Sequence, residues 1–415
     1  MTVLAALLVT LGAIPERPLD WNALLRSHAT DPKLHSVDQR LDLMDDPVSP
    51  GWWKKAEIQG EVAGFDRREF NGKLKIQPFG WGERTALREQ WSGRTRLLRI
   101  QRNRLQGQAQ EDRYQRGLEW IFCQRKLAFH RAMHTLYQER VGAHLSLIGT
   151  SRFDPQDLVL SQQMVASLSG DLLADQNDLA EIEASLFSMA PGSHQIALDT
   201  AELMRPEQLA RALEALPHEV DSSFPSIALA QEQVHASERS EQLSAASRRN
   251  WIGDVYTGYS NKTEDKLKKT YTLTETEVVW TAGITIPLPF GDTRRLDERR
   301  SRLDVMDQVG DLEQVRWETS RKLDQLRMSI GSGLRQIAVC DSFVRKVDAG
   351  ALFTDFVVQS GSDPLLLLKG RMALLQTQWD LQKLNHDILS DFVRLLELTG
   401  RLAAAPERNL LSGRP

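Results

Sequence analysis

The chain has 415 residues, and its 52 Lys and Arg against 56 Asp and Glu give a formal net charge of −4. This balance argues against a nucleic-acid partner, because such proteins carry a basic domain or stripe. The two cysteines, Cys123 and Cys340, are too few for a zinc cluster or a disulfide framework. The sequence has no run of eighteen apolar residues, the length a membrane-spanning helix needs.

The first segment, residues 1–19, has the character of a possible signal. Met1–Ala13 is a short apolar run, like the apolar region of an export signal, but no basic residues precede it. The alternative is a frayed apolar terminus. We therefore expect this segment to lie outside the folded repeats.

Two collinear sets of short motifs indicate an internal duplication. Pro78-Phe79-Gly80 with Arg84 recurs as Pro289-Phe290-Gly291 with Arg295, and Gly149 recurs as Gly361. Because the order is the same in both copies, the motifs predict one repeat over 20–192 and a second over 224–402. A linker over 193–223 and a C-terminal tail over 403–415 complete the chain.

Each copy predicts the same order of elements. An amphipathic helix begins at a proline, and a β-hairpin of alternating apolar and polar residues follows. A very long helix and a return helix end the copy. The predicted helices are 32–46, 84–148 and 155–190 in the first copy, and 225–249, 292–358 and 363–402 in the second. The strands of the first hairpin are expected to be about eight residues long.

The helix lengths favour a rod over a globular bundle. A helix of about 65 residues is roughly 100 Å long, whereas globular helices average about 12 residues. The two shorter helices of each copy together match the long one, so they can stack end to end beside it. Four strands per chain cannot close a barrel, but three chains would supply twelve. The fold class is therefore mainly α with a small β part.

The sequence resembles the outer membrane efflux protein family, the TolC-like channels. The resemblance covers roughly residues 20–402, and the Ile-Pro-Leu-Pro stretch at 286–289 leans towards the metal-efflux branch. The motifs that carry it are Asp31-Pro32-Lys33-Leu34, Ile284-Thr285-Ile286-Pro287-Leu288-Pro289-Phe290-Gly291-Asp292, Ser360-Gly361-Ser362-Asp363-Pro364-Leu365, Leu374-Leu375-Gln376 and Leu398-Thr399-Gly400.

The resemblance implies a homotrimer whose duplicated repeats form an α-barrel tunnel plus a 12-stranded outer-membrane β-barrel. Such a protein lies in outer membrane lipid with a long periplasmic portion. It serves as the passive exit duct of a tripartite efflux or secretion system, beside a periplasmic membrane-fusion (adaptor) protein and an inner-membrane pump. The resemblance implies no cofactor and no enzymatic activity.

The sequence departs from this family in three ways, one of which is the weak export signal at Met1–Ala13. The first hairpin is short for a bilayer, which takes strands of about 9–11 residues. Leu366–Gly370 stands where the family often has an Asp-x-Leu-Asp-Ala pattern, so Lys369 replaces an acid. These departures motivate the alternative function, a TolC-like helical scaffold or interaction protein that no longer conducts.

Two groups of residues are candidate sites. The periplasmic tip, or channel entrance, is expected at Gly149, Asp154, Asp157, Gly361, Ser362, Asp363 and Lys369. Membrane-interface aromatics are expected at Trp52, Trp53, Trp251 and Trp280. The arginine clusters Arg84–Arg104 and Arg294–Arg302 follow the hairpins, where they face a leaflet, the tunnel or solvent.

No catalytic or metal site is expected. His130 and His134 are four apart on a predicted helix, so both rings could face one ligand, but no third ligand stands nearby. Cys123 and Cys340 fall inside long helices, where a free cysteine usually packs as a small hydrophobe. No glycine-rich phosphate loop or nucleophile elbow is present.

Overall fold

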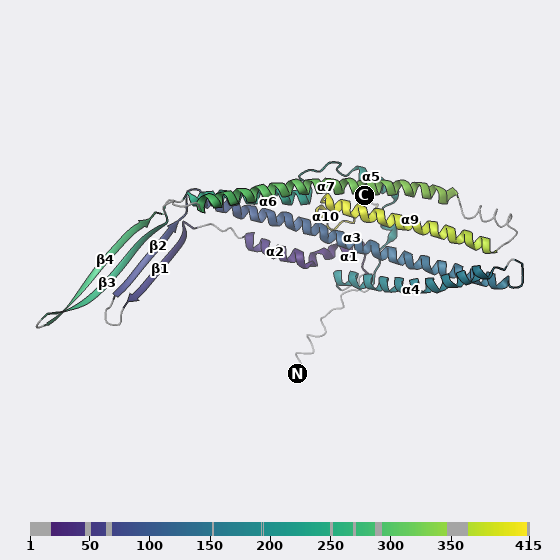
Figure 1. The fold of residues 1–415 in the computed structure, drawn as a ribbon, viewed down its shortest axis with the longest axis horizontal. Coiled ribbons are helices and arrows are strands. Elements are labelled where there is room, and N and C mark those ends of the chain that lie inside the picture. Colours follow the sequence, from purple (N-terminus) through teal and green to yellow (C-terminus); the bar gives the residue numbers. More distant parts are fainter. Residues whose placement is uncertain are drawn as a thin grey trace, which may run out of the picture. The chain divides into compact units, whose positions relative to one another are not determined.

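The computed structural model shows two long-helix repeats joined to one small sheet (Figure 1). Of the candidate residues, Trp251, Gly361, Ser362 and Asp363 lie outside the described part of the chain. The described residues are 18–45, 51–63, 69–151, 153–191, 193, 195–249, 252–268, 271–286, 293–346 and 364–412.

The two copies contain the same elements in the same order, as the motifs predict. The first copy runs α2 (Pro32–Asp45), β1 (Trp53–Ala63), β2 (Glu69–Pro78), α3 (Glu83–Ser146) and α4 (Pro155–Met189). The second runs α6 (Pro225–Arg248), β3 (Asp254–Lys268), β4 (Tyr271–Thr285), α7 (Thr293–Lys346) and α9 (Pro364–Leu398). Smaller helices are α1 (Trp21–Arg26), η1 (Ser27–Thr30), η2 (Thr200–Glu202), α5 (Pro206–Glu214) and α10 (Arg401–Ala404).

Proline sets the first residue of the shorter helices. α2, α4, α6 and α9 all begin at a proline, whose missing N–H is one that a first helical turn leaves unbonded. The observed starts agree with the predicted ones within one residue. The predicted end of the second long helix lies outside the described residues, since α7 is described to Lys346.

The first hairpin is longer than expected. β1 has 11 residues and β2 has 10, whereas the sequence suggested strands of about eight. The ladder extends from Trp53 opposite Pro78 to Ala63 opposite Glu69. Phe70 and Gly72 pair with Val62 and Gly60, so the strands continue further towards the turn than expected. Charged residues such as Lys55 and Lys75 keep the two-residue period and occupy one face. The strands therefore reach the length that a tilted membrane strand needs.

The four strands form one antiparallel sheet in the order β1-β2-β3-β4 (Figure 1). The central pairing joins the two copies, with Ile76 opposite Val255 and Phe70 opposite Asn261. β1 and β4 are the edge strands, and within the described residues neither outer edge has a strand partner.

The contacts gather into two compact units, and each unit takes residues from both copies. One unit holds residues 1–36, 102–226 and 317–415, and the other holds 37–101 and 227–316, which include the sheet. The core of the first unit surrounds Trp21, Tyr114 and Phe392, which are all almost completely buried. Tyr114 donates a hydrogen bond to the Arg408 carbonyl and accepts one from the Leu410 N–H, which fixes the C-terminal segment to α3.

Within the first unit the long helices contact one another in the order α4, α3, α9, α7. Trp120 of α3 donates a hydrogen bond to Glu183 of α4. Trp379 of α9 stacks on Phe129 of α3 with ring centroids 5.0 Å apart. Ser329 of α7 donates a hydrogen bond to Asp391 of α9 at 2.7 Å. The order of the helices thus leaves α4 and α7 as the outer members, as β1 and β4 are in the sheet.

The outer helices expose apolar side chains. On α4 these are Val159, Leu160, Met164 and Leu173, and on the part of α7 in this unit they are Trp317, Met328 and Val339. Side chains of this size are normally covered when several follow one helix face.

Candidate functional site

The sheet has one uncharged face and one charged face. Cross-strand partners point to the same side, so the register assigns each residue to a face. Among residues whose side chains the structure describes, one face carries Ala56, Ile58, Gly60, Phe70, Gly72, Leu74, Ile76, Val255, Thr257, Tyr259, Asn261, Val278, Trp280, Ala282 and Ile284. The other face carries Lys55, Glu57, Gln59, Glu61, Asn71, Lys73, Lys75, Gln77, Asp254, Tyr256, Gly258, Ser260, Glu277, Val279, Thr281, Gly283 and Thr285.

The uncharged face is open rather than packed. Ile58 is 85% exposed and Trp280 is 73% exposed, although both lie mid-strand. Aromatic rings line part of this face, since Tyr259 contacts Trp280 edge-on at 5.1 Å between centroids. A soluble protein would cover such a face with a helix or a second sheet. Lipid is the solvent that this face suits, whereas the charged face suits water.

Two of the predicted interface aromatics lie together at the helix-side end of this sheet. Trp52 and Trp53 are exposed at the start of β1, and Trp81 is exposed in the turn before α3. The Arg84 guanidinium lies 5.4 Å from the centre of the Trp52 ring. Trp280 belongs to the uncharged face further along the sheet.

Two of the predicted tip residues meet across the ends of the helices. Asp157 in the first turn of α4 lies 3.2 Å from Arg140 of α3 and 3.9 Å from Lys369 of α9. Arg140 is the stronger partner, because its guanidinium donates a hydrogen bond whereas the Lys369 ammonium lies beyond that distance. Lys369 is half-exposed, so its charge faces water as well as Asp157.

The turn between α3 and α4 is shaped by the other predicted residues. Gly149 has a φ of +87°, which a residue with a side chain adopts only at a cost. Asp154 caps α4, and its carboxylate accepts hydrogen bonds from the N–H groups of Gln156 and Asp157. Asp154 therefore has a structural role at this turn, and Asp157 is the acid that contacts the neighbouring helices.

The same turn contains a buried histidine that the sequence did not single out. His144 on the last turn of α3 is 1% exposed, and neither ring nitrogen has a hydrogen-bond partner among the described residues. A buried polar group without a partner costs about 1–3 kcal/mol. No sequence pattern indicates this burial, because most residues next to His144 in the chain are exposed or half-buried.

The histidine pair His130 and His134 is held by other side chains. The His130 ring contacts buried Asp175 of α4 at 2.5 Å, and Lys126 binds the other oxygen of Asp175 at 2.8 Å. His134 contacts the Ser169 hydroxyl at 3.2 Å. This cluster connects α3 to α4 within the hairpin. Among the described residues, no group of three or more His, Cys, Asp or Glu is arranged to hold a metal ion.

An acidic pocket of about 460 Å³ lies where α3, α7 and α9 meet. Burial and the nearby Glu111 carboxylate raise the pKa of Glu397 to about 7. Burial, with a smaller effect of Asp112, also raises the pKa of Glu111. Arg394 lowers the pKa of Glu111, and Arg104 and Lys322 lower that of Glu397, but burial prevails.

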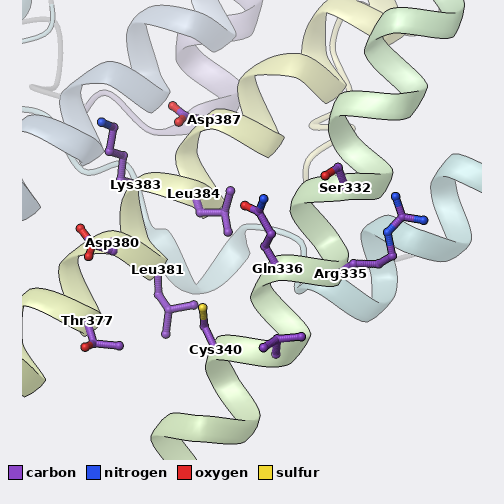
Figure 2. A pocket seen from close by; sticks show the side chains of 11 residues that line it. Ser332, Arg335, Gln336, Cys340, Thr377, Asp380, Leu381, Lys383, Leu384 and Asp387 are labelled. Atoms are coloured by element: carbon purple, nitrogen blue, oxygen red, sulfur yellow. The ribbon is translucent and has the colours of Figure 1, made fainter.

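A second pocket of about 630 Å³ lies between α7 and α9 (Figure 2). Figure 2 shows Cys340 of α7 and Leu381 of α9 pointing toward one another, whereas the Lys383 side chain points away from them. The other cysteine, Cys123, is half-buried, and burial raises the pKa of its thiol. A raised pKa leaves that thiol protonated and unreactive.

The helices themselves do not have the character of membrane spans. Among the described residues, none of the helices combines the length and the hydropathy that crossing a bilayer requires.

No protein-family model matches the sequence, and no curated protein matches it either. Solved structures do match. CusC, described for transmembrane channel formation, is 14% identical at a TM-score of 0.61, covering 91% of this chain and 90% of its own. The outer membrane protein VceC of Vibrio cholerae is 13% identical at a TM-score of 0.62, covering 91% and 95%.

The open state of the MtrE outer membrane channel of Neisseria gonorrhoeae gives a TM-score of 0.61 at 10% identity, covering 91% and 87%. The TM-scores for CusC, VceC and MtrE are nearly equal, so they distinguish no branch, and the lean towards metal efflux stays a prediction. These similar structures are channels rather than enzymes. The chain has the fold of outer-membrane channel proteins over nine-tenths of its length.

Proposed function

We propose that the chain is a TolC-like outer membrane channel of the outer membrane efflux family. It serves as the passive exit duct of a tripartite efflux or secretion system. The observation that supports this most directly is the sheet, whose uncharged face suits lipid and whose charged face suits a water-filled lumen. The shared fold with VceC and MtrE supports the same proposal.

The proposed assembly is a homotrimer. Open strand edges are not tolerated in lipid, because their N–H and C=O groups have no water to bond. β1 of one copy would pair with β4 of the next, and three copies would close twelve strands. Trimer formation would also cover the exposed apolar residues of α4 and α7, because these two helices are the outer members of the helix layer.

The proposed direction places the helices in the periplasm and the sheet in the outer membrane. The ends of α3, α4 and α9 around Asp157 and Lys369 would then form the entrance that meets an adaptor, with an inner-membrane pump supplying the energy. The repeat boundaries at 20–192 and 224–402 belong to this proposal. The alternative of a non-conducting scaffold loses one of its motives, because the first hairpin has strands of 11 and 10 residues.

Single-cysteine labelling tests the assignment of the two faces. The starting protein carries Cys123→Ala and Cys340→Ala, and each test variant adds one cysteine in a strand. After reconstitution into vesicles, Gln59→Cys and Lys73→Cys should react with a membrane-impermeant maleimide. Their strand neighbours Ile58→Cys and Leu74→Cys should be protected by lipid. Equal labelling of all four would contradict the barrel, and light scattering that found a monomer in detergent would contradict the trimer.

A further inference from the structure

A group of arginines follows the sheet closely in both copies. Arg84 and Arg88 lie in the first two turns of α3, and Arg299 and Arg300 lie in the first two turns of α7. At about 1.5 Å per residue, all four are within roughly 10 Å of the first residue of their helix. They belong to the same compact unit as the sheet. We call these four residues the arginine collar.

The charge of the collar is largely uncompensated. Two neighbouring acids already have basic partners, since Lys54 binds buried Glu83 at 2.6 Å and Arg302 binds Glu298 at 2.6 Å. Arg88, Arg299 and Arg300 are exposed, and the described residues offer them no ion pair or hydrogen bond.

Two acids near the collar remain free to offset it. Glu89 and Asp297 are exposed carboxylates on α3 and α7. Even with both counted, the four arginines of the collar outnumber these two carboxylates, which leaves an excess of positive charge at this level of the unit. Such an excess attracts anions from solvent or from a membrane surface.

The aromatic residues beside the collar favour a membrane surface. Trp52 is 79% exposed and Trp81 is 87% exposed, at the end of the sheet where the collar begins. Exposed tryptophans with neighbouring cations are typical of the membrane–water interface, where the rings lie among the headgroups and the cations meet phosphates. The headgroup layer of one leaflet is about 5–7 Å deep. Arginine side chains on a helix lean towards its N-terminus, so those of Arg299 and Arg300 can reach back from the second turn of α7 to this layer.

We propose that the arginine collar binds the phosphate headgroups of anionic lipids in the leaflet that meets the helix-side end of the sheet. This inference rests on the proposed function, since it requires the sheet to lie in a membrane. The collar would fix the depth at which the sheet is inserted and would favour leaflets that contain anionic lipid. Near an anionic surface each arginine strengthens membrane partitioning by about fivefold.

Vesicle flotation with the full chain tests the collar. The vesicles contain phosphatidylcholine alone or with a fraction of phosphatidylglycerol, and the variant combines Arg299→Gln with Arg300→Gln. The control combines Arg316→Gln with Arg371→Gln, which removes the same charge from exposed positions further along α7 and on α9. Phosphatidylglycerol should increase the inserted fraction of the unmodified protein and of the control, and the collar variant should lose about tenfold or more of that gain.

Several results would overturn the inference. An unchanged gain from phosphatidylglycerol in the collar variant would contradict it. An equal loss of this gain in the control variant would mean that the net charge of the chain, and not the collar, determines lipid binding. Inorganic phosphate that competes better than chloride at equal ionic strength would assign the collar to free phosphate instead. Protein that inserts and conducts equally well in both kinds of vesicle would refute lipid binding by the collar but leave the channel function intact. Protein that inserts into neither kind would refute the channel function.

Discussion

Two glycines two residues apart on α7, and so on different faces of the helix, give opposite predictions for the same substitution. A Cβ on Gly333 would lie 2.6 Å from Cγ1 of Ile388 and 2.7 Å from its Cδ1. Ile388 is buried on α9, so it has little room to move away. A Cβ on Gly331 would meet nothing within 4 Å. Gly331 is therefore a control with the same chemistry on the same helix.

The expected energies follow from these distances. Replacing glycine by alanine inside a helix stabilises it by about 0.5–1 kcal/mol, and Gly331→Ala should show this gain. Gly333→Ala has the same gain but forces α7 and α9 apart, and overpacking of this kind costs about 1–3 kcal/mol. The free energy of unfolding should therefore be lower for Gly333→Ala than for Gly331→Ala by about 1–3 kcal/mol.

Denaturant unfolding followed by circular dichroism measures this difference in detergent. The slope of the transition should be the same for both variants, because neither alters the surface exposed on unfolding. If Gly333→Ala is as stable as Gly331→Ala, the packing of α7 against α9 is not as described. If Gly331→Ala is itself strongly destabilised, another chain fills the space beside it.

Four further predictions concern the acidic pocket, the tip and the sheet. Because the pKa of Glu397 is raised from 4.5 to about 7, the folded protein holds this proton more tightly than the unfolded chain, so stability should fall as pH rises through that window. Glu397→Gln should flatten this pH dependence and stabilise the protein above pH 7 by about 3 kcal/mol, whereas Glu313→Gln at an exposed position should do neither. His144→Leu should raise the unfolding midpoint, since it removes a buried ring without partners; a lower midpoint would indicate a partner for the ring. Lys369→Asp should shift the reversal potential under a salt gradient towards cations, and unaltered selectivity would mean that Lys369 does not line the entrance. Ile58→Lys should reduce insertion into vesicles by placing a charge in lipid, while Gln59→Lys on the opposite face should not.

The sequence predicted the local structure well because its signals are local. Proline at 32, 225 and 364 marks helix starts, and the absence of proline within α3 and α7 marks the long helices. The first hairpin was predicted too short because Glu69–Gly72 were assigned to its turn, whereas the structure pairs them with β1. Charged residues such as Lys55 and Lys75 are ordinary on a face of a sheet that contacts water, so the two-residue period predicts the strands better.

The sites depended on contacts that no local pattern reveals. Asp157 meets Arg140 and Lys369 from two other helices, and Lys369 is far from Asp157 in the sequence. Glu111 and Glu397 come from opposite ends of the chain, and only burial makes their carboxyl groups unusual. The two compact units likewise cross the repeats, because helices far apart in the chain pack side by side.

Conductance in a planar lipid bilayer tests the central claim most directly. The purified chain should insert as a trimer and produce discrete current steps of uniform size, since three copies of the charged sheet face would surround a water-filled path. Steps that disappear when the sheet is deleted, but persist in Gly331→Ala, would connect the current to the sheet. A stable, inserted trimer that carries no current under any voltage or salt condition would contradict the account and leave the helical scaffold as its function.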